Sequence, residues 1–429
     1  MGPPGGGLLL ISHGIFSSKM KSIFQIFASK RMFVMLLLGF SAGIPYALTA
    51  GTLQAWLATE NVDIKTIGLF ALVGIPYNWK FIWAPLMDRF FPKFLGRRRG
   101  WMLVTQIGLA LAIAGMALTS PSYSITMMAL LAVTVAFFSS SQDIVIDAYR
   151  TEALKTEEYG AGSALYIMGY RLAMLVSGAL ALILSDHFSW KTVYLLMAAT
   201  IIVGVIGTLL GPEPVTGKPP RTIREAVVEP LSEFFKRTGA IEVLLFLLLY
   251  KLGDAVGTAL MTKFFMDLGF TKTDIGAVTK VFGLIATIVG TLIGGALIPR
   301  LGMLRSLVIF GILQGVTNLL FLMMTQVGND RLALIFTIAG ENLAGGMGTA
   351  AYAAFLMSLC NKRFTATQYA LFTSLMAVPT KILSAPTGYL KEAVGWENYF
   401  IIATLLTIPG LLMLFRFHHW KRPVDTEVA

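Results

Sequence analysis

Apolar stretches of about 20 residues recur along the whole chain and are separated by short polar segments. A helix needs about 20 mostly apolar residues to cross the hydrocarbon core of a bilayer. The pattern predicts an all-α integral membrane protein with 12 transmembrane helices. The predicted spans are residues 32–57, 66–87, 101–119, 124–149, 160–185, 191–211, 239–267, 273–298, 303–325, 331–358, 366–390 and 396–415.

The composition fits a helical membrane protein. The 429 residues are 56% hydrophobic and only 13% charged, and they include 42 glycines and 29 phenylalanines. Glycine lets helices approach closely where lipid surrounds them. The one cysteine, Cys360, cannot form an internal disulfide.

The net charge of +11 raises the question of a nucleic-acid partner, but its distribution points elsewhere. If both termini lie inside, the inside segments carry 23 of the 34 lysines and arginines. Cytoplasmic loops of membrane proteins are enriched in these residues. We therefore expect cytoplasmic termini and no nucleic-acid partner. The outside loops carry only Lys65, Lys191, Lys272, Arg331 and Lys391.

A polar, proline-rich segment at 212–238 divides the chain into two similar halves. Three residues in or next to the fifth span recur in the eleventh at a constant offset, namely Tyr159, Arg171 and Gly178 as Tyr369, Lys381 and Gly388. The matches indicate a duplicated six-helix unit. The expected domains are an N-terminal extension with a possible surface helix (1–31), a six-helix bundle (32–211), a cytoplasmic linker (212–238), a second six-helix bundle (239–415) and a cytoplasmic tail (416–429).

Two six-helix halves joined by an inside loop are typical of the major facilitator superfamily, whose halves move about a site near the membrane midplane. The stretch "APLMDRFFPKFLGRRRG" resembles the superfamily signature between helices 2 and 3, although its spacing is longer. On this resemblance a gate at the cytoplasmic side would be formed by Asp88, Arg89, Arg97, Arg98 and Arg99. An ordinary positively charged inside loop remains the alternative.

Longer stretches resemble the AmpG-type muropeptide permeases of this superfamily, among them "SQDIVIDAYRTEAL", "GYRLAMLVSG" and "LYKLGDAVGTALMTKFF". The similarity covers roughly residues 22–415. It implies a proton-driven importer of anhydro-muropeptides in the bacterial inner membrane, with roles in peptidoglycan recycling and β-lactamase induction. We expect protons and membrane lipid as further partners, a monomer, no enzymatic activity, and no cofactor, because the proton gradient drives transport.

Carboxylates inside the spans are candidates for proton coupling, since charges are costly in a membrane and are kept there for function. The candidates are Asp143, Asp147, Asp254 and Glu341. Asp143, Asp147 and Arg150 stand at i, i+4 and i+7 and share one face of the fourth span. Asp143 is the deeper carboxylate, so we expect it to carry the proton while Asp147 and Arg150 hold the gate. A structural salt bridge is the alternative, above all for Asp147.

Cations, amides and aromatic rings in the spans are candidates for binding the solute, whose stem peptide carries carboxylates that Arg can grip bidentately. Arg171 and Lys381 are expected to face each other across the two halves. Trp79 and Trp83 are expected to share a helical face that stacks on a sugar, whereas Trp56 is expected to anchor at the membrane interface. The candidates are Arg171, Lys251, Lys381, Lys80, Lys263, Lys280, Gln142, Asn78, Trp79, Trp83 and Gln54.

Several alternatives stay open from the residues alone. Lys251 and Asp254 can form a purely structural pair, and Lys263 can extend its amine to the interface. Another large anionic solute, such as an acyl-CoA, would need the same cations. A membrane-embedded transferase could use Asp147 as its acid. The histidines lie outside the spans and no Gly-Lys-Ser/Thr phosphate loop occurs, so we expect neither a metal cluster nor ATP as the energy source.

Overall fold

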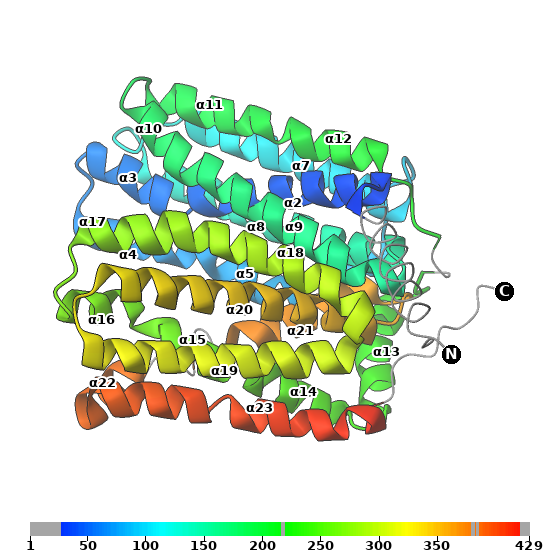
Figure 1. The fold of residues 1–429 in the computed structure, drawn as a ribbon. Coiled ribbons are helices and arrows are strands. Elements are labelled where there is room, and N and C mark those ends of the chain that lie inside the picture. The colour runs from blue at the N-terminus through cyan, green and yellow to red at the C-terminus, as the bar shows by residue number, and fades with distance from the viewer. Residues whose placement is uncertain (1–26, 216–218, 379–381, 383–385, 421–429) are drawn as a thin grey trace, which may run out of the picture.

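Long helices, roughly parallel or antiparallel to one another, build the molecule (Figure 1). The computed structural model describes residues 27–215, 219–378, 382 and 386–420. The long elements of the first half are α2 (Lys30–Leu48), α3 (Gly51–Thr59), α7 (Arg97–Ala117), α8 (Ile125–Ala153), α9 (Tyr159–Met174), η4 (Leu175–Leu180), α10 (Ala181–Ser185), α11 (Trp190–Thr200) and α12 (Ile202–Leu210).

The second half repeats this plan after the linker. Its elements are α14 (Ala240–Leu249), α15 (Leu252–Ala259), α16 (Met261–Asp267), α17 (Lys272–Ile275), η5 (Gly276–Phe282), α18 (Gly283–Leu301), α19 (Met303–Val327), α20 (Arg331–Leu359), α21 (Thr365–Val378), α22 (Thr387–Leu405), α23 (Ile408–Met413) and η7 (Leu414–His419). Gly395, with φ of 75°, interrupts α22 between the last two predicted spans. Only glycine adopts this conformation readily.

Nine helices in the described part of the chain are long and apolar enough to cross a membrane. They coincide with the first, the third to ninth and the twelfth predicted spans. The tenth predicted span corresponds to α20, and the described part of the eleventh corresponds to α21. The nine are Lys30–Thr59, Arg97–Ala117, Ile125–Ala153, Thr156–Ser185, Trp190–Leu210, Ala240–Asp267, Gly276–Leu301, Met303–Val327 and Thr387–His419.

The second predicted span, 66–87, is not one regular helix. It consists of α4 (Ile64–Leu69), η1 (Phe70–Gly74), α5 (Ile75–Trp79), η2 (Lys80–Ile82) and α6 (Ala84–Arg89), of which η1 and η2 are 3-10 helices. Pro76 and Pro85 stand in the first turns of α5 and α6. Proline is tolerated there because these backbone N–H groups have no partner within the helix. The breaks change which side chains share a face.

Small residues let neighbouring helices touch backbone to backbone. A Cβ atom added to Gly39 of α2 would lie 2.1 Å from the carbonyl oxygen of Tyr166 in α9, and one added to Gly290 of α18 would lie 2.3 Å from that of Leu343 in α20. Any larger residue would push these pairs apart. Close contact through small residues is how membrane helices gain packing energy.

A linker helix, α13 (Ile223–Phe235), lies across one end of the bundle, which we call the α13 end (Figure 1). Its Thr222 N-cap accepts a hydrogen bond from the backbone N–H of Glu225. Such a cap stabilises the start of a helix. Ala226, Pro230 and Phe234 are spaced four apart and buried, so α13 places one face against the bundle.

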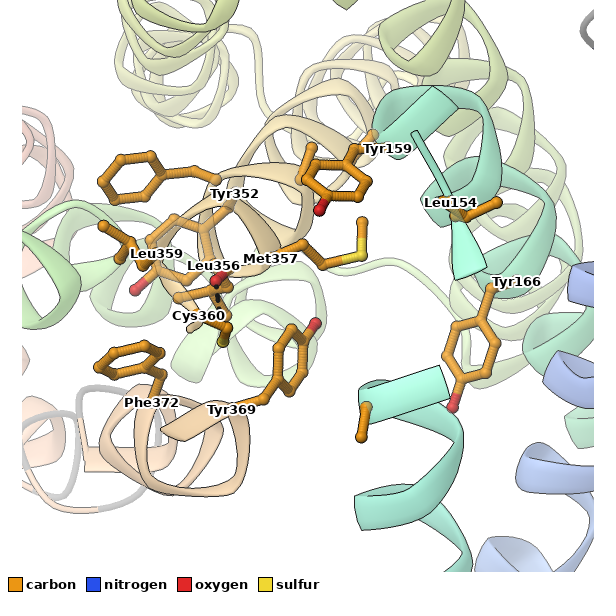
Figure 2. Close-up of a cluster of buried hydrophobic side chains, with 14 of the residues drawn as sticks. Leu154, Tyr159, Tyr166, Tyr352, Leu356, Met357, Leu359, Cys360, Tyr369 and Phe372 are labelled. Carbon is orange, nitrogen blue, oxygen red and sulfur yellow. Dashed lines mark hydrogen bonds between the residues drawn. The ribbon is translucent and has the colours of Figure 1, made fainter. Parts of the chain in front are cut away.

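Among the described residues, the hydrophobic cluster that both halves share lies at the α13 end. One large cluster there draws on both halves, and Figure 2 shows part of it, including Leu154 and Tyr166 of the first half and Tyr369 and Phe372 of the second. Toward the opposite end each half has a cluster of its own, one from Ile44 to Ile201 and one from Val256 to Ala403. Within the described residues, the halves are therefore joined mainly at one end.

Candidate functional site

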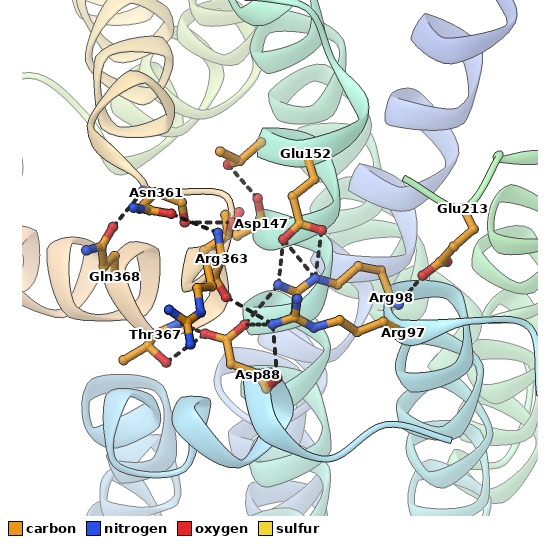
Figure 3. Close-up of polar contacts among 12 residues, drawn as sticks. Asp88, Arg97, Arg98, Asp147, Glu152, Glu213, Asn361, Arg363, Thr367 and Gln368 are labelled. Carbon is orange, nitrogen blue, oxygen red and sulfur yellow. Dashed lines mark hydrogen bonds and ion pairs between the residues drawn. The ribbon is translucent and has the colours of Figure 1, made fainter. Parts of the chain in front are cut away.

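Asp88 is the centre of a buried ionic network at the α13 end (Figure 3). Its Oδ1 accepts hydrogen bonds from Nη2 of Arg97 and of Arg98, each at 2.9 Å. Its Oδ2 accepts from the backbone N–H and the hydroxyl of Thr367 at 2.9 and 2.7 Å. Thr367 lies on α21, so this carboxylate joins the two halves.

Arg98 continues the network to α8. Its guanidinium makes a bidentate contact with Glu152, with Nη2–Oε1 at 2.5 Å and Nε–Oε2 at 2.9 Å, and both side chains are fully buried. Glu213 accepts hydrogen bonds from the backbone N–H groups of Arg98 and Arg99 at 2.8 and 3.0 Å. A carboxylate at this position satisfies free N–H groups in the first turn of α7.

The side chains of two residues that the sequence placed in the gate lie outside this network. The Arg89 guanidinium lies 5.1 Å from the centre of the Phe90 ring. Arg99 instead donates to the backbone carbonyls of Thr208 and Leu209 at the end of α12. Arg89 follows Asp88 in the chain, and Arg99 follows Arg98. Because successive side chains on a helix point about 100° apart, the side chains of Arg89 and Arg99 point away from the network.

Arg150 also bridges the halves. Its Nη2 donates to Oδ1 of Asp147 at 2.7 Å and to the phenol oxygen of Tyr369 on α21 at 2.9 Å. Its guanidinium lies 4.0 Å from the centre of the Tyr166 ring. One planar cation thus contacts α8, α9 and α21 at once, a task that the fork of arginine suits and the single amine of lysine does not.

Lys80 and Asp143 complete a cluster in the first half, which we call the first-half cluster: Lys80, Asp143, Asp147 and Arg150. Lys80 Nζ lies 3.7 Å from Oδ2 of Asp147. Oδ1 of Asp143 is buried without a hydrogen-bond partner among the described residues. The charged groups acting on Asp143 are Lys80, Asp147 and Arg150. Two cations therefore face two carboxylates in this cluster.

Gln142, beside this cluster, is fully buried and accepts a hydrogen bond from the Ser41 hydroxyl at 3.2 Å. Its amide nitrogen has no partner among the described residues. The side chain thus ties α8 to α2 and leaves one buried donor unused. An unused buried donor is costly and is often kept for a ligand or water.

A second charged cluster lies in the other half, and we call it the second-half cluster: Lys251, Asp254, Gln314 and Glu341. Lys251 Nζ lies 3.4 Å from Oδ2 of Asp254 and donates to Oε1 of Gln314 at 2.8 Å. Asp254 and Lys251 are the charged groups that act on Glu341, which lies on α20. Among the described side chains of this cluster, Lys251 pairs with Asp254.

A cavity of about 540 Å³ lies between the second-span segment and α21. Trp79 is more than half exposed and lines it, and so does Ser374, whose hydroxyl has no partner among the described residues. Both halves therefore contribute to one mostly apolar space with an aromatic ring and polar groups. Its lining consists of Asn78, Trp79, Phe81, Leu371, Ser374, Leu375, Ala377, Val378 and Ile382.

The expectation that Trp79 and Trp83 share a face is wrong. Trp83 turns to α8, where its ring lies 5.1 Å from that of Phe137 and its N–H donates to Ser141 at 3.0 Å. The 3-10 helix η2 separates the two tryptophans, and its tighter winding rotates residues four apart away from one another. Only Trp79 faces the cavity.

The remaining candidates are scattered. Gln54 is exposed on α3. Lys263 is largely exposed and pairs with Asp267 at 2.5 Å, which fits its interfacial alternative. Trp56 is buried and stacks on Trp190, so it is not the interface anchor that we expected. Arg171 is half-buried on α9. Lys381 and the side chain of Lys280 lie outside the described part, so the expected opposition of Arg171 and Lys381 stays a prediction.

Sequence reasoning missed several residues that the structure brings to these clusters. Glu152, Gln314 and Thr367 were not singled out, although Glu152 and Gln314 were visible as polar residues next to long apolar runs. Such residues are expensive in a membrane unless they have partners. That signal could have found Glu152 and Gln314. The cross-half contact of Thr367 had no signal in the sequence.

Comparison with known proteins identifies the family to which this chain belongs. Residues 35–380 match the family model of the Major Facilitator Superfamily. The "Anhydromuropeptide permease" of Escherichia coli is 49% identical over 393 residues, which cover 91% of this chain and 80% of the relative. A "Putative transporter AmpG 1" of Rickettsia bellii is 32% identical over 402 residues, covering 90% and 98%.

Two solved structures share the fold. The proton:xylose symporter XylE has a TM-score of 0.66 at 12% identity, with 93% of this chain and 96% of that chain covered. The human organic anion transporter MFSD10 has a TM-score of 0.63 at 14% identity, with 92% and 99% covered. At such identities the likeness concerns the fold alone. The chain is thus a multi-pass membrane protein that belongs to the major facilitator superfamily and, within it, to the family of the anhydromuropeptide permeases.

Proposed function

We propose that this protein imports anhydro-muropeptides, the N-acetylglucosaminyl-anhydro-N-acetylmuramyl peptides of cell-wall turnover, across the bacterial inner membrane together with protons. The 49% identity to the Escherichia coli anhydromuropeptide permease over 91% of the chain carries the proposal. Such import would serve peptidoglycan recycling and the induction of β-lactamase. Membership of a transporter family leaves the transferase alternative without support.

In this proposal the α13 end faces the cytoplasm, and both termini are cytoplasmic. The excess of lysine and arginine in the segments at this end supports the orientation. The cross-half contacts of Asp88 with Thr367 and of Arg150 with Tyr369 lie at the same end. The structure then corresponds to a state closed toward the cytoplasm, as alternating access requires while solute enters from outside.

The chemistry of an anhydro-muropeptide suits the groups that line the proposed path. Its peptide carboxylates match cations such as Lys251 and the half-buried Arg171. Its sugar rings have apolar faces that stack on aromatic side chains, and Trp79 offers an exposed ring in the cavity between the halves. Asn78 and Ser374 add polar groups to the same cavity.

Uptake into proteoliposomes tests the proposal directly. A labelled N-acetylglucosaminyl-anhydro-N-acetylmuramyl peptide should accumulate inside only when the outside is more acidic, and an uncoupler should abolish the accumulation. Acyl-CoA, which represents the other class of large anionic solute, should neither accumulate nor compete. Competition by acyl-CoA without uptake of the muropeptide would instead favour the alternative carrier.

A further inference from the structure

We propose that the exposed apolar side of the linker helix α13 is a docking site for anionic bilayer lipid, at the level of the lipid headgroups. The observation that carries the proposal is the way in which α13 sorts its side chains. Its exposed side is apolar and basic, whereas its three carboxylates are paired with cations of the protein. The proposal does not depend on which solute the protein carries.

The position of α13 suits a membrane surface. The spanning helices run along the membrane normal, and α13 lies across one end of them (Figure 1). It packs against α6, α14 and α21, and the buried Ala226, Pro230 and Phe234 mark the side that is turned to the bundle. An amphipathic helix in this orientation can lie in the plane of the membrane interface.

The apolar surface of α13 is wider than the part that the bundle covers. Five further apolar side chains are each between 38% and 55% exposed. Because successive side chains of a helix turn by about 100°, the five fall within an arc of about 140°. This arc, which we call the outer face, consists of Ile223, Val227, Val228, Leu231 and Phe235. An apolar arc of this width is costly in water and is stabilised where it reaches the acyl chains of a bilayer.

The acidic residues of α13 point to protein partners. The carboxylates of Glu225 and Glu229 lie 3.4 and 3.3 Å from guanidinium nitrogens of Arg363. The carboxylate of Glu233 lies 2.5 Å from the guanidinium of Arg237. The three acids are spaced four apart, so they share one side of the helix, and that side is separate from the outer face. Negative charge is thus kept away from the outer face.

Basic side chains accompany the outer face. Arg224 is exposed within it, and Arg221 and Lys236 are exposed just before and just after the helix. Long basic side chains lay their carbon chain on an apolar surface and extend the charge to the headgroups. Positive charge beside an apolar strip is complementary to a bilayer surface that contains anionic lipid.

A second protein is the other possible occupant, and the size of the outer face argues against it. The 13 residues of α13 form a strip about 20 Å long and about 10 Å wide. A stable protein interface buries about 800 Å² on each partner, which is far more than such a strip offers. A bilayer surrounds the spanning helices in any case, so docking on it needs no large area.

Quenching by brominated lipid tests the docking in a bilayer. In a Cys360→Ser background, Leu231→Cys places a nitrobenzoxadiazole label on the outer face. The matched control is Ser232→Cys, because Ser232 is half-buried and its side chain points about 100° away from that of Leu231. In liposomes, phosphatidylcholine brominated near the headgroup end of its acyl chains should quench the Leu231 label severalfold more than the Ser232 label. Val228→Cys serves as the second variant if Leu231→Cys does not yield folded protein.

The headgroup preference is measured with the same label. Brominated phosphatidylglycerol should reach half-maximal quenching at a mole fraction about five times lower than brominated phosphatidylcholine, since each basic residue near a membrane surface favours anionic lipid by about this factor. Arg221→Gln combined with Arg224→Gln should remove the preference. Lys191→Gln combined with Arg331→Gln removes two exposed basic residues at the opposite end and should keep it.

Three results would overturn the proposal. The first is a Leu231 label that is quenched no more than the Ser232 label. The second is equal quenching of the Leu231 label by the two brominated lipids in the chain that keeps Arg221 and Arg224. The third is a Leu231→Cys chain that escapes quenching but forms a disulfide with a second copy, which would make the outer face a protein contact. All of these measurements are made without solute, so they leave the proposed transport function untouched.

Discussion

Several charged side chains inside this membrane bundle are each held by more than one partner. Arg98 is fully buried, yet it is bound by Asp88 and, bidentately, by Glu152. Desolvating such ions is expensive, and only close, well-directed contacts offset the cost. Removing one ion therefore harms the structure more than the ion pair itself stabilises it, because the partners remain buried and unpaired.

Arg98→Met is expected to lower the free energy of unfolding by about 3–5 kcal/mol, since Asp88 and Glu152 lose their shared cation inside the protein. Arg89→Met is the matched control, because Arg89 contacts only the ring of Phe90 among the described interactions and should cost less than about 1 kcal/mol. Thermal unfolding in detergent measures both. Equal losses in the two variants would contradict the central place of Arg98.

Tyr369→Phe is expected to loosen the contact between the halves. It removes the phenol oxygen that Arg150 reaches across them, a hydrogen bond to a charged group worth about 1.5–3 kcal/mol. The one thiol of the chain, Cys360, is 5% exposed beside this contact and reports opening. Its labelling by a maleimide should become roughly ten to a hundred times faster.

The control for this experiment is Tyr159→Phe. Tyr159 is the counterpart of Tyr369 in the internal repeat, but its hydroxyl donates to the carbonyl of Thr151 within the first half. Its loss should leave the labelling of Cys360 unchanged. Faster labelling in both variants would mean that the effect comes from general destabilisation and not from the cross-half bond.

Among the elements, the linker helix α13 has a structural task beyond connecting the halves. Gln368, just inside α21, donates to the carbonyl of Pro230 and to Glu233, and Arg363 lies 3.4 and 3.3 Å from Glu225 and Glu229. The helix thus holds the loop between α20 and α21. The same loop contributes the carbonyl of Arg363 to Arg97 of the ionic network.

Phe234→Ala is expected to cost about 3–5 kcal/mol of stability, because the ring is 2% exposed and packs 5.2 Å from that of Phe372. Phe235→Ala is the matched control, since this neighbouring ring is 55% exposed. Differential scanning fluorimetry in detergent compares the two. A larger loss for Phe235→Ala would show that α13 binds the bundle through its other face.

At the scale of the whole molecule, contacts between the halves gather at the α13 end. The shared core cluster, the Asp88 network and the Arg150 bridge all lie there, whereas the two other core clusters belong to one half each. A protein joined at one end and separated at the other can exchange which end is closed by rocking its halves. If the α13 end faces the cytoplasm, as proposed above, breaking its contacts is the energetic cost of reaching the inward-facing state.

Solute binding is expected to expose the α13 end. A saturating anhydro-muropeptide at pH 6 should speed the maleimide labelling of Cys360 several-fold relative to the free protein, because the inward-facing state separates Tyr369 and Thr367 from the first half. Cys360→Ser gives the background, and xylose serves as an unrelated solute. Labelling that stays the same with and without the peptide would argue against rocking at this end.

The protein class, most of the helices and the family could be predicted from the amino-acid sequence. Apolar runs and the duplicated spacing predicted the spans, because a helix in lipid must satisfy its own backbone and bury an apolar surface whatever its neighbours are. The spacing of Lys251 and Asp254 predicted their contact for a similar local reason. The second span was not predicted correctly as one regular helix. Prolines and 3-10 turns change its winding and turn Trp83 away from Trp79.

Which charged side chains from different helices contact one another depends on how the helices pack, and the sequence did not predict it. Asp88 accepts hydrogen bonds from Thr367, and Arg150 donates one to Tyr369, across 279 and 219 positions of the chain, and no local pattern encodes such separations. The charge balance of the first-half cluster, two cations for two carboxylates, also depends on contacts between separate helical segments. The periodicity of the sequence determines on which face of its helix a residue lies. The electrostatic energy of a charged residue depends on the charged groups of the neighbouring helices, and only the packing of the helices determines which groups those are.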